Sequence, residues 1–311
     1  MKNTTAFDLY QLFHQNNTPR KYPQRLHFRG VDGYDVYNAS APFLSIGKEL
    51  IAGRVEKRDS EHSKVMFFEK VNHEFILLSD APVFTLQDPC ITRINGELIL
   101  SGVEIFPHPD NPGALWWRTA FYRGKDVYSL ERFTAGPNGM KDIRLCELKD
   151  GKIAVFTRPR HPMGEMGSEG GRGVIGYVEI DNLAELVPDK LNQAQHLDQI
   201  SGHSWLGANE VFCLNDTLLG VLCHVAMFDF NSSRHYFAAV FTFNRKTLQP
   251  GPLEIIAERN DYLPGPAKCP DLHDVIFPAC LRFNEDRAWL ICGVSDCEMQ
   301  SLEIVNPFKN L

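Results

Sequence analysis

Five polar residues open five strand-like segments of the chain, and their types and spacing could support acid–base chemistry. In each segment an Asp or Asn precedes an apolar strand, a turn follows, and a second apolar strand returns. Carboxyl and amide groups repeated in this way can move protons or hold hydroxyl groups if the fold brings them together. The opening residues are Asn38, Asp88, Asp142, Asn209 and Asp274, at intervals of 50, 54, 67 and 65 residues.

Most of the returning strands end on a charged or titratable residue at a nearly constant offset. Two strands of about six residues joined by a turn make a hairpin of this length, so both ends are expected side by side. The pairs are Asn38 with Arg54, Asp88 with Glu104 and Asp142 with Arg158, each 16 residues apart, and Asn209 with His224, 15 residues apart.

The spacing of the segments predicts the fold. Period-two alternation and turns such as Asn95-Gly96 dominate, and helical patterns are confined to residues 6 to 14 and 181 to 199. Five units of this size match four-stranded blades, so we expect an all-β, five-bladed β-propeller. Residues 1–311 would form one domain, with a short N-terminal segment of about residues 1–28.

In a propeller the first strand of each blade lines the central channel, so the polar residues are expected to meet in one funnel. The alternative is that they only cap strand ends and form turns. The expected lining is Asn38, Arg54, Asp88, Glu104, Lys141, Asp142, Arg144, Arg158, Asn209, Glu210, His224, Asp274 and Asp296.

Several cations belong to this set although the protein is acidic overall, with a net charge of −7. Together they indicate an anionic co-substrate such as phosphate, which Arg binds in bidentate fashion. The alternative for any one Arg is that it neutralises a neighbouring Asp. The glycine-rich run from 163 to 173 predicts a loop beside the funnel, from which Arg172 could cover a bound anion.

A neutral sugar would be held by the remaining Asn, Asp and Glu side chains and by aromatic faces. Candidates are Trp116, Trp117, Trp205 and Tyr236, and the first two could equally belong to the core. Inverting transfer to water needs an acid and a separate base, whereas phosphate is already a nucleophile. One acid and a basic pocket are therefore enough for a phosphorylase.

Composition excludes several classes of protein. The acidic balance argues against a nucleic-acid partner. The sequence shows neither a signal-peptide pattern nor an apolar run long enough to cross a membrane, which predicts a cytoplasmic protein without a membrane partner. The eight cysteines contain no CxxC pair and are expected to be buried thiols, with no metal site.

Motifs along most of the chain resemble a known family. The segments are VDGYDVYNASAPF, AGRVEKRDSEHSKVMFF, QDPCITRINGE, GMKDIRL, GKIAVFTRPR, GANEV, RHYF and GVSDCE. They look like the mannosyltransferase/phosphorylase family, formerly a domain of unknown function, over about residues 29 to 298. That family is distantly similar to the inverting β-mannoside phosphorylases, which are five-bladed propellers.

The resemblance implies roles for individual residues. Asp88 of Gln87-Asp88-Pro89-Cys90 matches the general acid of a Glu-Asp-Pro-Arg motif, although Gln87 and Cys90 replace the flanking Glu and Arg. Sugar contacts fall on Asn38, Arg54 and Asp296, and phosphate contacts on Lys141 and Arg158. Arg144, Arg172 and His224 are added as phosphate ligands, and Glu104, Asn209 and Asp274 as sugar ligands, from the expected funnel geometry.

The resemblance further implies an inverting glycoside phosphorylase or mannosyltransferase that acts on β-1,2-mannooligosaccharides with phosphate, mannose 1-phosphate or a sugar nucleotide. Phosphate would be a co-substrate, and no cofactor is expected. Two alternatives stay open. One is a hydrolase that uses Glu104 or Asp296 to activate water, and the other is a propeller that binds a carbohydrate or protein without catalysis.

Overall fold

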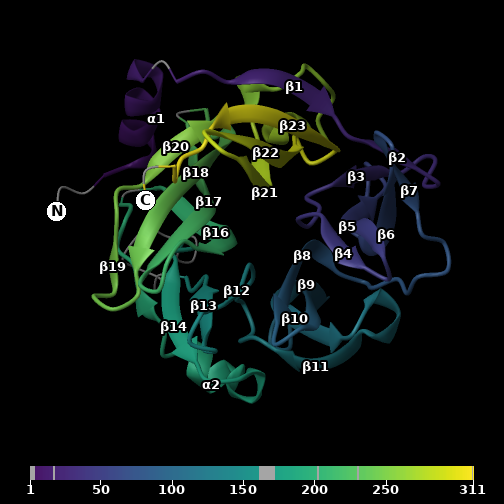
Figure 1. Ribbon diagram of the computed structural model, residues 1–311. Helices are drawn as coiled ribbons and strands as arrows, with labels where there is room; N and C mark the ends of the chain where they lie inside the picture. The colour runs from purple at the N-terminus through teal and green to yellow at the C-terminus, as the bar shows by residue number, and fades with distance from the viewer. Residues whose placement is uncertain (1–3, 17, 161–171, 202, 230, 310) are drawn as a thin grey trace. The chain divides into compact units, whose positions relative to one another are not determined.

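Five β-sheets make up most of the computed structural model, which describes residues 4–16, 18–160, 172–201, 203–229, 231–309 and 311. Within each sheet most neighbouring strands follow one another in the chain and run antiparallel (Figure 1). The predicted fold class, an all-β five-bladed propeller, is confirmed. The chain divides into two compact units: unit 1 is Met1–Leu26, Arg160–Ile175 and His196–Leu311, and unit 2 is His27–Pro159 and Gly176–Gln195.

Unit 2 carries three sheets. The first contains β2 (His27–Arg29), β3 (Asp35–Tyr37), β4 (Phe43–Ser45), β5 (Lys48–Glu56), β6 (Lys64–Val71) and β7 (Glu74–Leu77). The second contains β8 (Gln87–Ile94), β9 (Glu97–Pro107), β10 (Leu115–Gly124) and β11 (Glu131–Ala135). The third contains β12 (Arg144–Glu147), β13 (Ile153–Thr157), β14 (Gly176–Ile180) and β15 (Gln195–His196), at which the unit ends.

Apolar side chains between neighbouring sheets hold unit 2 together. One cluster joins the first and second sheets and contains Phe67 from β6 together with Leu98 and Leu100 from β9. Another joins the second and third sheets, with Ile99 from β9 and Val155 from β13. These side chains alternate along their strands with residues on the opposite face, so the sheets have a fixed register. The strand ends that carry the polar residues are therefore held in place by the core.

Unit 1 carries the other two sheets. The fourth contains β16 (Trp205–Cys213), β17 (Leu218–Phe228), β18 (Arg234–Asn244), β19 (Gln249–Pro250) and β20 (Glu254–Ala257). The fifth contains β21 (Ile276–Asn284), β22 (Arg287–Val294), β23 (Glu298–Val305) and the N-terminal strand β1 (Lys21–Arg25). Because Lys21 pairs with Glu303, the segment set apart in the prediction as residues 1–28 supplies the edge strand of the last sheet.

Helices are few, as the period-two pattern predicts. α1 (Ala6–Gln15) begins at a capping box between Thr5 and Asp8 and lies against β17 and β20 of its own unit. The second helical pattern gives only the short α2 (Pro188–Leu191), with Pro188 in its first turn. Within the ranges that the structure describes, no helix is long and apolar enough to cross a membrane.

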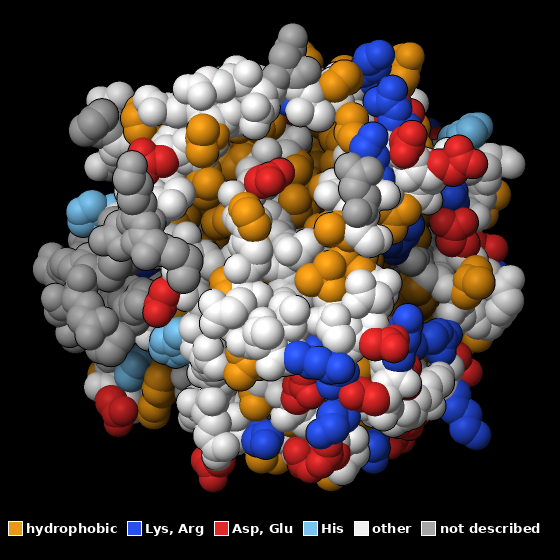
Figure 2. Space-filling view, turned by 60° about the vertical axis from the view of Figure 1, so that its left-hand side comes forward, with side chains coloured by type: hydrophobic (Ala, Val, Ile, Leu, Met, Phe, Trp, Pro, Cys, Tyr) orange, Lys and Arg blue, Asp and Glu red, His pale blue; other side chains and the backbone are white. Residues whose placement is uncertain are grey.

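The surface carries charges of both signs. On the face drawn in Figure 2, basic and acidic side chains lie interspersed rather than gathered into one basic field. The eight cysteines are free thiols, and Cys146, Cys223, Cys280, Cys292 and Cys297 are buried. Burial raises the pKa of the Cys292 thiol to about 12, which is the behaviour of a small hydrophobic residue rather than a nucleophile.

Candidate active site

The opening residues of the three hairpins of unit 2 share one unusual backbone conformation. Asn38, Asp88 and Asp142 have φ angles of 44°, 47° and 59°, in the left-handed region that Asn and Asp tolerate better than other residues with a Cβ. Asn38 directly follows β3, and Asp88 lies where the pairing of β8 with β9 shifts between Gln87 and Cys90. A bulge of this kind re-aims a side chain. The repeat in the sequence is therefore also a repeat of backbone geometry.

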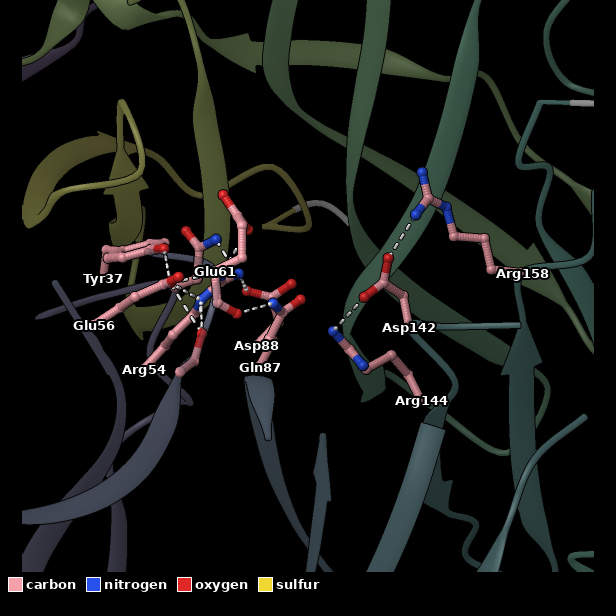
Figure 3. Close-up of polar contacts among 11 residues, drawn as sticks. Tyr37, Arg54, Glu56, Glu61, Gln87, Asp88, Asp142, Arg144 and Arg158 are labelled. Carbon is pink, nitrogen blue, oxygen red and sulfur yellow. Dashed lines mark hydrogen bonds and ion pairs between the residues drawn. The ribbon is translucent and has the colours of Figure 1, made fainter. Parts of the chain in front are cut away.

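Three of the predicted residues meet at the carboxyl group of Asp88. Asn38 Nδ2 donates a hydrogen bond to Asp88 Oδ1 at 3.1 Å, and Arg54 Nη1 donates to the same oxygen at 3.0 Å. All three side chains are buried. Figure 3 shows Arg54 next to Asp88. A charged donor and an amide donor on one oxygen fix the carboxyl plane, so the acid is held in one orientation at the start of β8.

Arg54 is held from its other side by a carboxylate that was not predicted. Glu56 Oε2 accepts from Arg54 Nε at 2.9 Å, and it lies 2.7 Å from Arg54 Nη2. Tyr37 and Ser63 donate their hydroxyl groups to the same oxygen, and the guanidinium carbon of Arg54 lies 4.8 Å from the centre of the Tyr37 ring. These contacts lock the position of the Arg54 side chain (Figure 3).

A second charged cluster lies at the start of the third sheet, whose strand β12 contacts β8. The fully buried carboxylate of Asp142 accepts from Arg158 Nη1 at 2.7 Å, and its other oxygen lies 3.6 Å from Arg144 Nη2 (Figure 3). Burial would raise the pKa of Asp142, but Lys141, Arg158 and Arg144 together hold it below its ordinary value. Lys141, Arg144 and Arg158 thus form a basic cluster around one carboxylate, and arginine side chains suit the binding of an anion.

Replacing Asp142 with Asn is expected to destabilise the protein in a pH-dependent way. The change leaves two buried guanidinium groups without their carboxylate, so the free energy of unfolding at pH 7 should fall by about 3–5 kcal/mol. Because the folded pKa lies below the unfolded value of about 3.9, this stabilisation is present above that pH and is lost as the pH falls through the folded value. Urea unfolding measured from pH 7 to about pH 3 should show the free energies of unfolding of the parent and of Asp142→Asn converging below about pH 4. A difference in free energy that stays constant with pH would contradict this.

Glu104 lies with a different set of partners. It binds Arg118 and Arg132, at 2.7 and 2.8 Å, from β10 and β11 of its own sheet. The register gives the reason. In the first hairpin Tyr37, the residue before Asn38, pairs with Arg54. In the second, Gln87, the residue before Asp88, pairs with Val103. Glu104 is therefore one residue beyond the position of Arg54, and one residue along a strand moves a side chain to the opposite face.

In unit 1 the structure brings two more predicted residues together. His224 Nδ1 lies 2.9 Å from Asn209 Oδ1, and Asn209 Nδ2 donates to the carbonyl oxygen of Pro278 at 2.8 Å. His224 is fully buried and its ring stacks near Tyr236 at 5.5 Å between centroids. Asn209 lies at a pairing irregularity between Ala208 and Glu210, as Asp88 does in β8.

A search of family models places the chain. Residues 13–310 match the protein family of unknown function DUF1861. The chain belongs to DUF1861. A search of curated proteins found no match.

Solved structures give more specific likenesses for this DUF1861 chain. It is 33% identical to MPT-4, a mannose phosphorylase from Leishmania mexicana in complex with phosphate ion, at a TM-score of 0.87 over 98% of this chain and 94% of that one. It is 31% identical to MPT-1, a GDP-Man-dependent mannosyltransferase from the same organism, at a TM-score of 0.86 over 98% of this chain and 95% of that one. The β-1,2-mannobiose phosphorylase from Listeria innocua shares the fold. It is 15% identical to this chain, at a TM-score of 0.61 over 88% of this chain and 91% of that one.

The remaining predicted ligands of the DUF1861 chain lie in unit 1. The carboxyl group of Asp274 is hydrogen-bonded to Nδ1 of His235, a residue at the start of β18. Asp296 lies with Ser295 in the turn between β22 and β23, and both have φ of 51°, as a tight hairpin turn requires. Arg172 lies over the rings of Trp205 and Phe228, 4.8 and 5.2 Å from their centres. Most of the predicted loop, residues 163 to 171, falls outside the described residues.

The aromatic candidates divide between the units. Trp205 donates its indole N–H to the Tyr236 hydroxyl at 3.0 Å in unit 1. In unit 2, Trp116 stacks on His108 at 4.4 Å, and Trp117 donates to the carbonyl of Gly139 at 3.0 Å, shortly before Lys141. All four rings are buried or half-buried. No group of three or more His, Cys, Asp or Glu side chains in the described part of the chain is placed to hold a metal ion.

Proposed function

We propose that this chain is an inverting glycoside phosphorylase or mannosyltransferase that acts on β-1,2-linked mannooligosaccharides. In this proposal phosphate or mannose 1-phosphate is the co-substrate and no cofactor takes part. Support comes from the likeness to MPT-4, named a mannose phosphorylase, and from the chemistry of the residues in unit 2. A sugar nucleotide is the alternative donor, since MPT-1 is named a GDP-Man-dependent mannosyltransferase.

The observation that carries the proposal is the pairing of one oriented acid with a cation cluster on the neighbouring strand. Asp88 is fixed by Asn38 and Arg54 at the start of β8, and β12, which contacts β8, begins at Arg144 of the cluster around Asp142. An acid next to a basic pocket is what phosphorolysis requires, because phosphate supplies the nucleophile itself.

In the proposed reaction Asp88 gives its proton to the glycosidic oxygen, directly or through a sugar hydroxyl. The bond from the anomeric carbon to that oxygen breaks, and a phosphate oxygen held by Lys141, Arg144 and Arg158 forms the new bond from the opposite face. The configuration at the anomeric carbon inverts. In the synthetic direction Asp88 takes the proton of the acceptor hydroxyl, since reversal requires the same group to exchange roles.

The test is to incubate the protein with mannose 1-phosphate and a short mannoside and to measure released phosphate. A parallel reaction with GDP-mannose, followed by released GDP, separates the two donors. Elongated mannoside together with released phosphate is the expected result. Absence of both products with every mannoside acceptor tried would overturn the proposal and favour a propeller that binds carbohydrate without catalysis.

A variant of Glu104 addresses the hydrolase alternative. Glu104→Gln is expected to keep the turnover number within about twofold of the parent value. Glu104 is held by Arg118 and Arg132, and it lies on the face of β9 opposite to the one that corresponds to Arg54 in the first hairpin. Its pKa is lowered, with burial opposing the hydrogen bonds from the two arginines, so it stays charged at neutral pH. A large loss of activity, together with mannoside cleavage that needs no phosphate, would favour a base role for Glu104.

A further inference from the structure

We propose that Glu56 is a positioning residue that acts as the permanent counter-ion of Arg54 and so lets Asp88 gain and lose a proton during turnover. The inference rests on the proposed function, because it assigns Glu56 to the same acid. The role of Glu56 follows from what it touches and from its burial.

Contacts from Arg54, Tyr37 and Ser63 converge on one oxygen of Glu56. Glu56 Oε2 binds Arg54 through Nε and Nη2, and it accepts the hydroxyl groups of Tyr37 and Ser63. The Glu56 side chain is fully buried and that of Arg54 is 6% exposed, so water does little to screen this pair. Each of these hydrogen bonds favours the charged form of the Glu56 carboxylate.

The opposite end of the same guanidinium reaches the acid. Arg54 Nη1 is 3.0 Å from Asp88 Oδ1, so one arginine lies between two buried carboxylates (Figure 3). If Asp88 were its only partner, protonation of Asp88 would leave a buried cation uncompensated, and the acid form would be strongly disfavoured. With Glu56 in place, Arg54 is neutralised whether Asp88 carries its proton or not.

Other charged groups face this pair from the surrounding elements. Glu61, from the loop after β5, lies 3.8 Å from Arg54 Nη2 but is 70% exposed, so solvent weakens its effect. Tyr37 lies under the guanidinium from β3. On the side of β12 stand the groups of the second cluster, Lys141, Asp142, Arg144 and Arg158. Glu56 is thus a buried carboxylate that offsets the charge of Arg54 without taking part in proton transfer.

The variant Glu56→Gln tests this role, since glutamine keeps the shape and an acceptor oxygen but loses the charge. The uncompensated Arg54 then favours the carboxylate form of Asp88, so phosphorolysis should be lost at a lower pH. We expect the alkaline limb of its pH–rate profile to move down by about 1 pH unit or more, which means about a tenfold loss at a pH on that limb. In the synthetic direction the acid limb should move the same way.

A matched control is available in β14 of the same unit. Tyr177 donates its hydroxyl to Glu179 Oε1 at 2.6 Å, so Glu179→Gln removes the charge from another Tyr–Glu pair. The profile of this control should overlay that of the parent. If Glu56→Gln shows a uniform loss at every pH, with no shift of either limb, Glu56 has only a structural role and the inference is wrong.

A measurement without turnover separates this inference from the proposed function. In protein carrying aspartate labelled with ¹³C at the carboxyl group, the Asp88 signal is the one lost in Asp88→Asn. We expect it to titrate at lower pH in Glu56→Gln than in the parent, and unchanged titration would overturn the inference even if the sugar assay succeeds. If the parent has no phosphorylase or transferase activity, the proposed function fails, and the titration still decides the role of Glu56.

Discussion

Replacing Asp88 with asparagine is expected to lower the turnover number by about 10²–10⁴-fold, the range that general acid–base groups contribute. Asparagine has the same shape and its amide oxygen can still accept the bond from Arg54, but it carries no proton to transfer. Position 88 has a left-handed backbone conformation, which also suits asparagine. Asn38 adopts the same conformation in the first hairpin. Initial rates of phosphate release from mannose 1-phosphate would measure the effect.

The control for this variant is Asp181→Asn, which removes a carboxylate paired with Lys152 at the surface of the third sheet. Its rates should match those of the parent, and both variants should keep the parent's circular dichroism spectrum. Turnover by Asp88→Asn within about tenfold of the parent, with the fold intact, would mean that another group supplies the proton.

The second large effect is expected for Arg158→Ala, as a rise of about 10- to 100-fold in the KM for phosphate. A hydrogen bond to a charged group contributes about 1.5–3 kcal/mol, and each 1.4 kcal/mol is a factor of ten. Arg158 is already turned toward Asp142, so its position does not depend on the ligand. Phosphorolysis rates at saturating mannoside and varied phosphate would give the KM for phosphate and the turnover number separately.

Arg29→Ala is the matched control, because Arg29 pairs with Glu74 on the first sheet and is 63% exposed. Its KM for phosphate should not change. If Arg158→Ala lowers the turnover number while the KM for phosphate stays at the parent value, Arg158 acts through Asp142 rather than on the anion.

Spacing alone could predict the fold and part of the site. The five opening residues recur because each blade repeats the same hairpin, and this regularity correctly brought Asn38 and Arg54 to Asp88. Arg158 was placed in the same way, since it ends the third hairpin beside Asp142.

Other features depended on facts that spacing does not contain. The second hairpin pairs Gln87 with Val103, and this register moved Glu104 away from the position its number suggested. Glu56 was missed because a carboxylate two residues after an arginine is common in surface strands, and only packing shows that this one is buried. Its signal was present, however, since β5 is otherwise apolar from Leu50 to Val55 apart from Arg54.

The edge strand of the last sheet has a consequence for biosynthesis. β1 ends at Arg25, but its partner β23 begins only at Glu298. A growing chain therefore holds β1 without its partner until the residues of β23 have been made, and the edge of β23 is covered only when the two strands pair. Contacts this distant in the chain form slowly, and open strand edges invite pairing with other chains. Recovery of active protein should thus depend on how nascent chains are shielded by chaperones.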